Sequence, residues 1–151
     1  RLDNYDYSSC GMYFVTVCAS ERRDIFWQPV GANCVRPCLS DVGRVVDREI
    51  QNLDNIYTDV SVESYCIMPD HIHLILFFSG AADGRTQFAP TLSRVIKQFK
   101  GTITKQLGYT VWQRSFYDHV IRDEKDLEIK RNYIDSNPYR LLEKYHQKKE
   151  V

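Results

Sequence analysis

The sequence predicts a single α+β domain in which a four-stranded antiparallel sheet carries helices packed mainly on one face. Three observations favour this fold class. The 151 residues, 43% of them hydrophobic, are enough for one core. Four stretches are rich in β-branched and aromatic residues, and three others have apolar residues at helical spacing. We therefore expect one domain over residues 1–151.

The first half of the chain predicts a strand, a helix and a hairpin. Met12–Ala19 is rich in β-branched and aromatic residues, which is typical of a strand. A helix is expected from about Ser40 to Tyr57, where apolar residues recur at helical spacing. Val60–Met68 and His71–Phe78 then form two strands joined through Pro69-Asp70, a pair suited to a tight turn.

A second helix is expected after the polar loop Ser79–Ala89. It begins near Thr91 and ends at Gly108, a residue that readily adopts the left-handed conformation found at helix ends. One face of this helix is apolar and the opposite face is basic.

A fourth strand, Ser115–Ile121, and a last helix complete the pattern. The helix begins at Asp123-Glu124 and should end at about Asn137, because Pro138 cannot donate the backbone hydrogen bond that continuation requires. The order β-α-β-β-α-β-α is that of the ferredoxin-like, split βαβ arrangement.

The charges are balanced overall but segregated along the chain. There are 20 basic and 20 acidic residues, yet the window Gly84–Tyr117 contains no acid. It carries the cations Arg85, Arg94, Lys97, Lys100, Lys105 and Arg114. Such segregation can form a local phosphate-binding surface, although a solvated helix face would have the same composition.

The location expected from the sequence is the cytoplasm, without a membrane anchor. No apolar run reaches the ~20 residues that cross a bilayer, and Arg1–Ser9 does not resemble an export signal. Five cysteines at irregular positions argue against a disulfide framework. Cys34 and Cys38 could ligate zinc, but no second pair lies at a suitable spacing.

The pattern His71-Ile72-His73 is the first candidate for chemistry. Residues two apart in a strand point the same way, so both imidazoles can bind one ion. Half-buried histidines that hydrogen-bond to the backbone are the alternative. In the last helix, Tyr133 and Asn137 lie one turn apart on one face. Two imidazoles and an amide oxygen suit Mg²⁺ or Mn²⁺, and the phenol could act as a nucleophile on a phosphate.

Three ordered blocks, residues 67–74 (IMPDHIHL), 112–122 (WQRSFYDHVIR) and 133–138 (YIDSNP), resemble the IS200-like (Y1) transposases of the HUH superfamily. Together with residues 11–17 (GMYFVTV), they are most similar to the branch associated with repetitive extragenic palindromes (REP). The resemblance covers about residues 11–142. The family usually has Asn where this chain has Asp70, which we interpret as a turn position that tolerates either residue.

The resemblance implies that His71 and His73 bind the metal, with Asn137 as a third ligand, and that Tyr133 is the catalytic tyrosine. It implies a metal-dependent transposase that cleaves and rejoins single-stranded hairpin DNA through a 5′-phosphotyrosine. A homodimer near the nucleoid is expected. The cations expected to contact DNA are Arg94, Lys97, Lys105 and Arg114.

Other residues and functions stay open. Tyr13, Trp112 and Phe116 could stack on bases or pack in the core, and strand alternation sends Asp118 and His119 to opposite faces. The same fold could be a catalytically silent module that binds hairpin DNA. A hydrolytic metalloenzyme ranks last, because no acidic partner accompanies the histidine pair in sequence at the spacing of known motifs.

Overall fold

The computed structural model describes residues 11–31, 35–79 and 90–149. It contains β1 (Gly11–Cys18), α1 (Asp41–Ile56), β2 (Val60–Ile67), β3 (His71–Phe78), α2 (Leu92–Leu107), β4 (Tyr117–Ile121) and α3 (Glu124–Lys149), with a short 3₁₀ turn at Ser20–Arg22. The predicted loop at 80–89, which includes Arg85, lies outside the described residues, as do Cys10 and Cys34.

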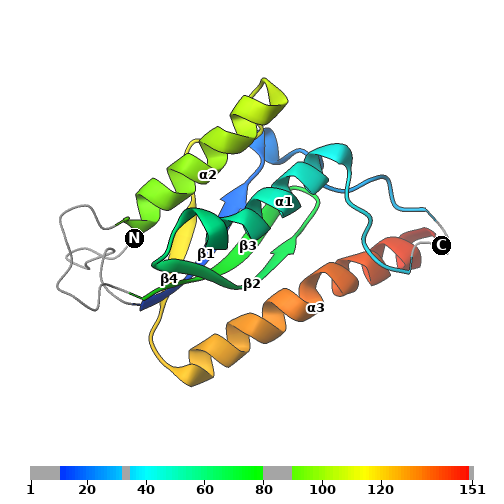
Figure 1. Cartoon of the computed structure of the whole chain (residues 1–151). Helices are drawn as coiled ribbons and strands as arrows, with labels where there is room; N and C mark the ends of the chain where they lie inside the picture. The colour runs from blue at the N-terminus through cyan, green and yellow to red at the C-terminus, as the bar shows by residue number, and fades with distance from the viewer. Residues whose placement is uncertain (1–10, 32–34, 80–89, 150–151) are drawn as a thin grey trace.

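The four strands form one antiparallel sheet in the order β2-β3-β1-β4. This is the order of a split βαβ unit, so the predicted fold class is confirmed. Helices α1 and α2 cover one face, whereas α3 lies on the other, as Figure 1 shows. None of the helices among the described residues is both long and apolar enough to span a membrane.

Local signals set the ends of α1 and α2. The side chain of Ser40 accepts a hydrogen bond from Gly43 N, and Thr91 caps Arg94 N in the same way. Gly108 ends α2 with φ +85°, a conformation that costs a glycine nothing. These helix limits agree with the predicted ones to within one or two residues.

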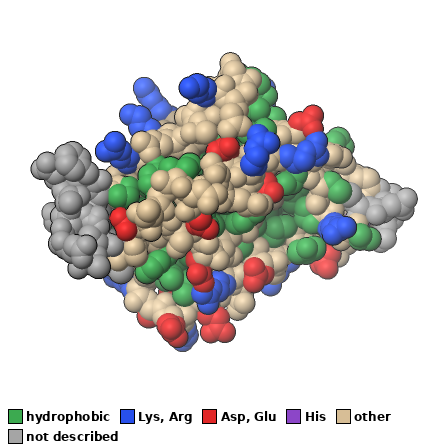
Figure 2. All heavy atoms as spheres, viewed as in Figure 1, with side chains coloured by type: hydrophobic (Ala, Val, Ile, Leu, Met, Phe, Trp, Pro, Cys, Tyr) green, Lys and Arg blue, Asp and Glu red, His purple; other side chains and the backbone are tan. Residues whose placement is uncertain are grey.

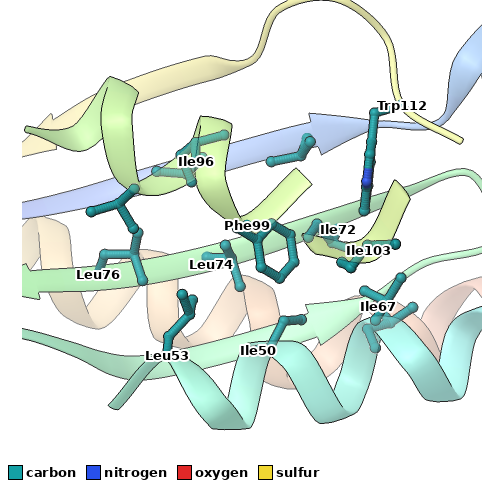
Figure 3. Close-up of a cluster of buried hydrophobic side chains, with 14 of the residues drawn as sticks. Ile50, Leu53, Ile67, Ile72, Leu74, Leu76, Ile96, Phe99, Ile103 and Trp112 are labelled. Carbon is teal, nitrogen blue, oxygen red and sulfur yellow. The ribbon is translucent and has the colours of Figure 1, made fainter. Parts of the chain in front are cut away.

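The main core lies between the sheet and helices α1 and α2 (Figure 3). Even-numbered residues of β3 point into it, with Ile72, Leu74 and Leu76 fully buried. Strand alternation sends His71, His73 and Ile75 to the opposite face, beneath α3. The sheet therefore separates the core from the predicted site.

The prediction that the last helix ends at Asn137 is wrong, since α3 continues through Pro138 to Lys149. A proline inside a helix removes one backbone hydrogen bond and costs about 3 kcal/mol. Packing beyond the proline offsets this cost, because Leu142 is buried and Leu141 and Tyr145 pack against the core. Tertiary contacts thus override the local signal.

Candidate functional site

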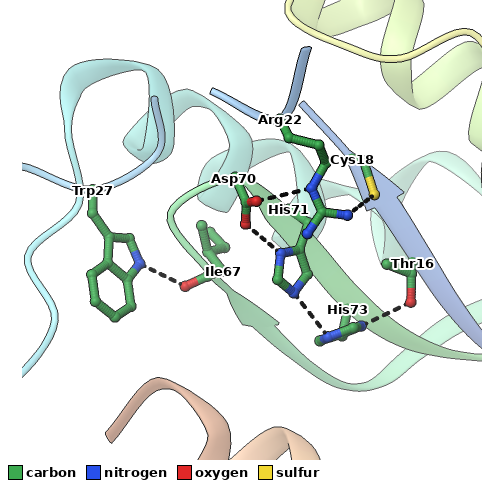
Figure 4. A network of polar contacts seen from close by, with 8 residues as sticks. All are labelled: Thr16, Cys18, Arg22, Trp27, Ile67, Asp70, His71 and His73. Atoms are coloured by element: carbon green, nitrogen blue, oxygen red, sulfur yellow. Dashed lines mark hydrogen bonds and ion pairs between the residues drawn. The ribbon is translucent and has the colours of Figure 1, made fainter. Parts of the chain in front are cut away.

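The turn between β2 and β3 places two histidines at the start of β3. His71 and His73 lie opposite Cys18 and Thr16 of the neighbouring strand β1. Their imidazoles converge, with the two Nε2 atoms 3.1 Å apart (Figure 4). The predicted common face of the pair is therefore observed.

The other nitrogen of each imidazole is held by a neighbour. His71 Nδ1 lies 2.6 Å from Asp70 Oδ1, and His73 Nδ1 lies 2.9 Å from Thr16 Oγ1. Both contacts orient the rings, and the Asp70 carboxylate, which can only accept, favours the tautomer of His71 that leaves its Nε2 as the acceptor. Both Nε2 atoms are thus presented to one point in space.

The environment keeps His73 neutral. Its side chain is buried, and burial, followed by electrostatic interactions with His71 and Arg22, lowers the pKa of His73 to about 3. A neutral imidazole has the lone pair that a metal ion requires. For Asp70, burial alone would raise the pKa, but hydrogen bonds with His71 and Arg22 together lower it. Asp70 is therefore an anion beside the histidine pair.

Arg22 joins this network from the 3₁₀ turn after β1. Its Nε donates to Asp70 Oδ2 at 2.9 Å and its Nη1 approaches Cys18 Sγ at 3.1 Å (Figure 4). Glu21 and Arg22 have φ values of 56° and 53°, left-handed conformations that cost a non-glycine residue about 1 kcal/mol or more each. This strained turn aims the guanidinium at Asp70.

Sequence reasoning missed the roles of Asp70, Arg22 and Thr16. Asp70 was interpreted only as a turn residue, although a carboxylate directly before an H-x-H pair is a natural partner for the first imidazole. Arg22 lies 48 positions from Asp70, and no local pattern links the two.

Helix α3 brings the predicted tyrosine to the histidines. The ring of Tyr133 lies 5.3 Å from that of His73, and 44% of Tyr133 remains exposed. Its neighbour Ile134 is buried against the sheet and holds this turn in place. His71, Tyr133 and Asn137 line a common groove of ≈ 630 Å³. The structure thus brings together all four residues predicted for the site.

The predicted basic face divides into two surfaces. Lys97 and Arg114 line a groove of ≈ 640 Å³ between α2 and the segment 110–116. Lys100 lies at the same groove and donates to the carbonyls of Gln113 and Ser115. Lys105 lines a different groove, between α2 and α1. Arg94 lines neither groove, but it lies close enough to Tyr57, which lines the second one, for its charge to act on that phenol.

Residues left open by the sequence take separate places. Tyr13 is buried in the core, so it offers no stacking surface, whereas Phe116 and the largely buried Trp112 both line the groove beside α2. His119 lies on the face toward α3 and approaches Asp126 Oδ2 at 2.9 Å. Asp118 points to the other face. Neither Asp118 nor His119 lines the groove of Tyr133.

The cysteines add no metal site to the described part of the chain. Cys18, Cys38 and Cys66 form no disulfide there, and no cluster of three or more His, Cys, Asp or Glu side chains is placed to hold an ion. Cys34, the other half of the possible zinc pair, lies outside the described residues.

Comparison with known proteins identifies relatives along most of the chain. The family described as "Transposase IS200 like" matches residues 8–137. Two Haemophilus influenzae proteins are each 29% identical over 91% of this chain. One is uncharacterised and is covered over 86% of its length. The other, covered over 76%, carries the provisional name REP-associated tyrosine transposase.

Two solved structures share the fold. A REP-associated tyrosine transposase bound to a REP hairpin superposes with a TM-score of 0.66 at 21% identity, over 93% of this chain and 73% of its own. A Deinococcus radiodurans protein, provisionally described as a transposase, gives a TM-score of 0.51 at 14% identity, over 90% and 95%. Since the family match spans residues 8–137, the chain belongs to the IS200-like transposase family.

Proposed function

We propose that this chain cleaves and rejoins single-stranded DNA at hairpin-bearing element ends through a 5′-phosphotyrosine on Tyr133. The observation that carries the proposal is the position of Tyr133, 5.3 Å from His73, whose Nε2 converges with that of His71. Membership of a transposase family supports DNA cleavage. The relative solved with a REP hairpin supports a hairpin substrate.

The donor set fits a divalent cation. Two Nε2 atoms 3.1 Å apart have the separation expected of adjacent ligands on an octahedral ion, about 3 Å for bonds of about 2.1 Å. The engaged Nδ1 atoms and the neutral state of His73 leave lone pairs aimed at that point. His71, His73 and the amide oxygen of Asn137 would hold Mg²⁺ or Mn²⁺. When bound, this cation would polarise the phosphate that is attacked.

The reaction is a displacement at phosphorus. Tyr133 Oη forms a bond to the phosphorus, and the bond from phosphorus to the 3′ oxygen breaks. The phenolic proton passes to solvent, and the departing 3′ oxygen takes up a proton. The product is a 5′-phosphotyrosine and a free 3′ hydroxyl, and a 3′ hydroxyl of another strand can reverse the step to join DNA without an external energy source.

An adduct assay tests the proposal. The protein is incubated with Mn²⁺ and labelled hairpin strands, and a denaturation-resistant protein–DNA adduct is measured. Wild type should form the adduct, and Tyr133→Phe, which keeps the ring beside His73, should form none. An adduct in Tyr133→Phe would exclude this nucleophile. Failure of the wild type across hairpins that it binds would favour the silent DNA-binding module.

The contact between Tyr133 and His73 within one chain leads to a prediction about the expected homodimer. Because Tyr133 and His73 of the same chain are in contact, Tyr133 should serve its own histidines. A mixture of Tyr133→Phe and His71→Ala proteins should therefore stay inactive. Recovery of adduct in the mixture would mean that the tyrosine acts across two subunits. Sedimentation of the wild type measures the oligomeric state itself.

For DNA contacts, we propose the groove of Lys97, Lys100 and Arg114 as the main phosphate surface. It combines three cations with hydroxyl and amide groups, all of which can donate hydrogen bonds to phosphate oxygens. Lys97→Ala should weaken binding and reduce the salt dependence by about one counterion. Lys105→Ala, on the same helix but in the other groove, is the matched control. Equal effects would instead assign the whole of α2, with Arg94 and Lys105, to DNA.

A further inference from the structure

A second groove adjoins the groove of Tyr133. It has a volume of ≈ 520 Å³ and lies between the segment 24–30 and the C-terminal part of α3. Asp24, Pro69 and Tyr145 line both grooves. The two grooves are therefore neighbours along one trough that begins at the histidine pair.

The walls of the second groove are mainly apolar. Trp27 is buried behind these walls, where its Nε1 donates to Ile67 O at 2.8 Å and its ring meets Tyr145 edge-on at 6.4 Å, so the partly exposed ring of Tyr145 is the aromatic surface of the groove. Pro29, Val30 and Pro69 add apolar surface, and Gln28 lines the groove as well. In Figure 2, hydrophobic side chains gather in the right half of the view, near the C-terminal part of α3. Aromatic and proline surfaces of this kind accept the face of a nucleobase.

The rim of the trough is charged. Arg140 and Lys144 line the groove of Tyr133, and Lys148 lines the second groove. Positions i, i+4 and i+8 of α3 follow one another along the helix, so the three cations form a row. Three carboxylates, Asp24, Asp70 and Glu143, also line the trough; a carboxylate can accept a hydrogen bond from a base amino group, whereas the cations can donate to phosphates. This pattern matches a nucleic-acid strand, with phosphates on the cations and a base in the apolar groove.

The occupant follows from this continuity. A strand whose phosphate lies at Tyr133 must leave the groove, and one way out passes along the row of cations into the second groove. A volume of ≈ 520 Å³ is in the range of pockets that take a small ligand. That volume is enough for one unpaired base and its sugar.

We propose that the segment 24–30 and the part of α3 beyond Pro138 form a pocket for one unpaired base of the DNA strand that Tyr133 cuts, at the far end of the trough from Tyr133 and about 18 Å from it along α3. The proposal rests on the proposed function and deepens it. It gives the helical extension beyond Pro138 a role in choosing where along the strand cleavage occurs.

The experiment scans a hairpin oligonucleotide with single abasic sites through its unpaired flank. Binding is measured by fluorescence anisotropy, with Tyr133→Phe protein so that no strand is cut. At one position, loss of the base should weaken binding roughly 5- to 100-fold, the range for a stacked base. In Tyr145→Ala, removing the base at that position should weaken binding little further. Tyr145→Phe keeps the aromatic ring, so its binding should still weaken when that base is removed.

Two controls make the outcomes separable. Lys148→Ala leaves the apolar walls intact, so it should weaken binding of every strand while keeping the response to the abasic position. Thermal unfolding shows whether Tyr145→Ala remains folded. If it does not, the abasic scan with Tyr145→Phe and Lys148→Ala decides whether the pocket binds a base. Strands that bind with no sensitive position in the flank would overturn the pocket. A flank position equally sensitive with and without the Tyr145 ring would overturn it too. The proposed function fails separately, if wild type forms no adduct.

Discussion

The two faces of the sheet are built for different purposes. The face toward α1 and α2 is a continuous apolar layer in which residues such as Ile72, Leu74 and Ile96 are fully buried. The face toward α3 has a much smaller apolar cluster, with Ile75 and Ile134 at its centre. Around that cluster the side chains are polar, aromatic and partly exposed.

Few residues of helix α3 are buried, which agrees with the small apolar cluster on this face of the sheet. Its buried residues are Ile134 and Leu142, and an ion pair joins Arg131 to Glu63 on β2. Surface ion pairs of this kind contribute little. Strand β3 contributes to both faces, since its residues alternate between the core and the site. The comparison teaches that stability and chemistry can be altered separately by changing adjacent residues.

The largest effect should come from a pair of adjacent substitutions on β3. Ile72→Ala removes a fully buried side chain and should lower the free energy of unfolding by about 2–5 kcal/mol. His71→Ala should change unfolding much less but abolish Mn²⁺-dependent adduct formation. Urea denaturation and the adduct assay, applied to both variants, measure the separation. Comparable losses of stability in the two would break the division between faces.

Acid should weaken the site face through His73. Its pKa is about 3 in the folded protein, against 6.5 for an ordinary histidine. Between these values the unfolded chain binds the extra proton, so stability is lost as the pH falls from 6.5 toward 3. The slope is at most about 1.4 kcal/mol per pH unit for one proton. Protonation of Asp70 also lowers stability as the pH falls, but at lower pH, because the pKa of this carboxyl is lowered below 3.8 in the folded protein.

Denaturation of metal-free protein at pH 7 and pH 5 measures this slope. His73→Gln cannot take up the proton and should show a shallower dependence. The same slope in both proteins would assign the acid sensitivity to other groups.

Removing the negative charge of Asp70, the partner of His71, should weaken metal binding more than it lowers the stability of the fold. Asp70→Asn keeps the shape of the side chain but removes the charge that contacts His71 and Arg22. Changes to such partners typically weaken metal binding about 10- to 100-fold. Calorimetric titration with Mn²⁺ measures the affinity, and Asp41→Asn, an exposed residue at the start of α1, is a control. An unchanged affinity for Mn²⁺ would mean that Asp70 acts only as a turn residue.

The smallest effect concerns the proline in α3. Pro138→Ala restores a backbone donor inside the helix and should raise the free energy of unfolding by about 1–2 kcal/mol, less than the full cost of a helical proline because the unfolded chain gains freedom. Thermal unfolding measures the gain. Lower stability would show that the proline sets the path on which Leu142 and Tyr145 pack.

Much of the fold was determined by the sequence through short-range signals. Ser40, Thr91 and Gly108 act on neighbouring backbone groups, so the limits of α1 and α2 could be read from them. Strand alternation likewise placed His71 and His73 on one face, because side-chain direction in a strand has a fixed period. Tyr133 and Asn137 were identified by the family resemblance of their block, and helical spacing placed them on one face.

Only the tertiary structure decided what depends on residues far apart in the chain. The contact of Arg22 with Asp70 spans 48 positions. The burial of Leu142 carries α3 past Pro138, and the packing of α2 beside segment 110–116 separates Lys97 from Lys105. Local propensities amount to about 1 kcal/mol per residue, with more for proline, whereas burying an apolar side chain contributes about 2–3 kcal/mol. Where the two disagreed, at Pro138, burial decided the structure.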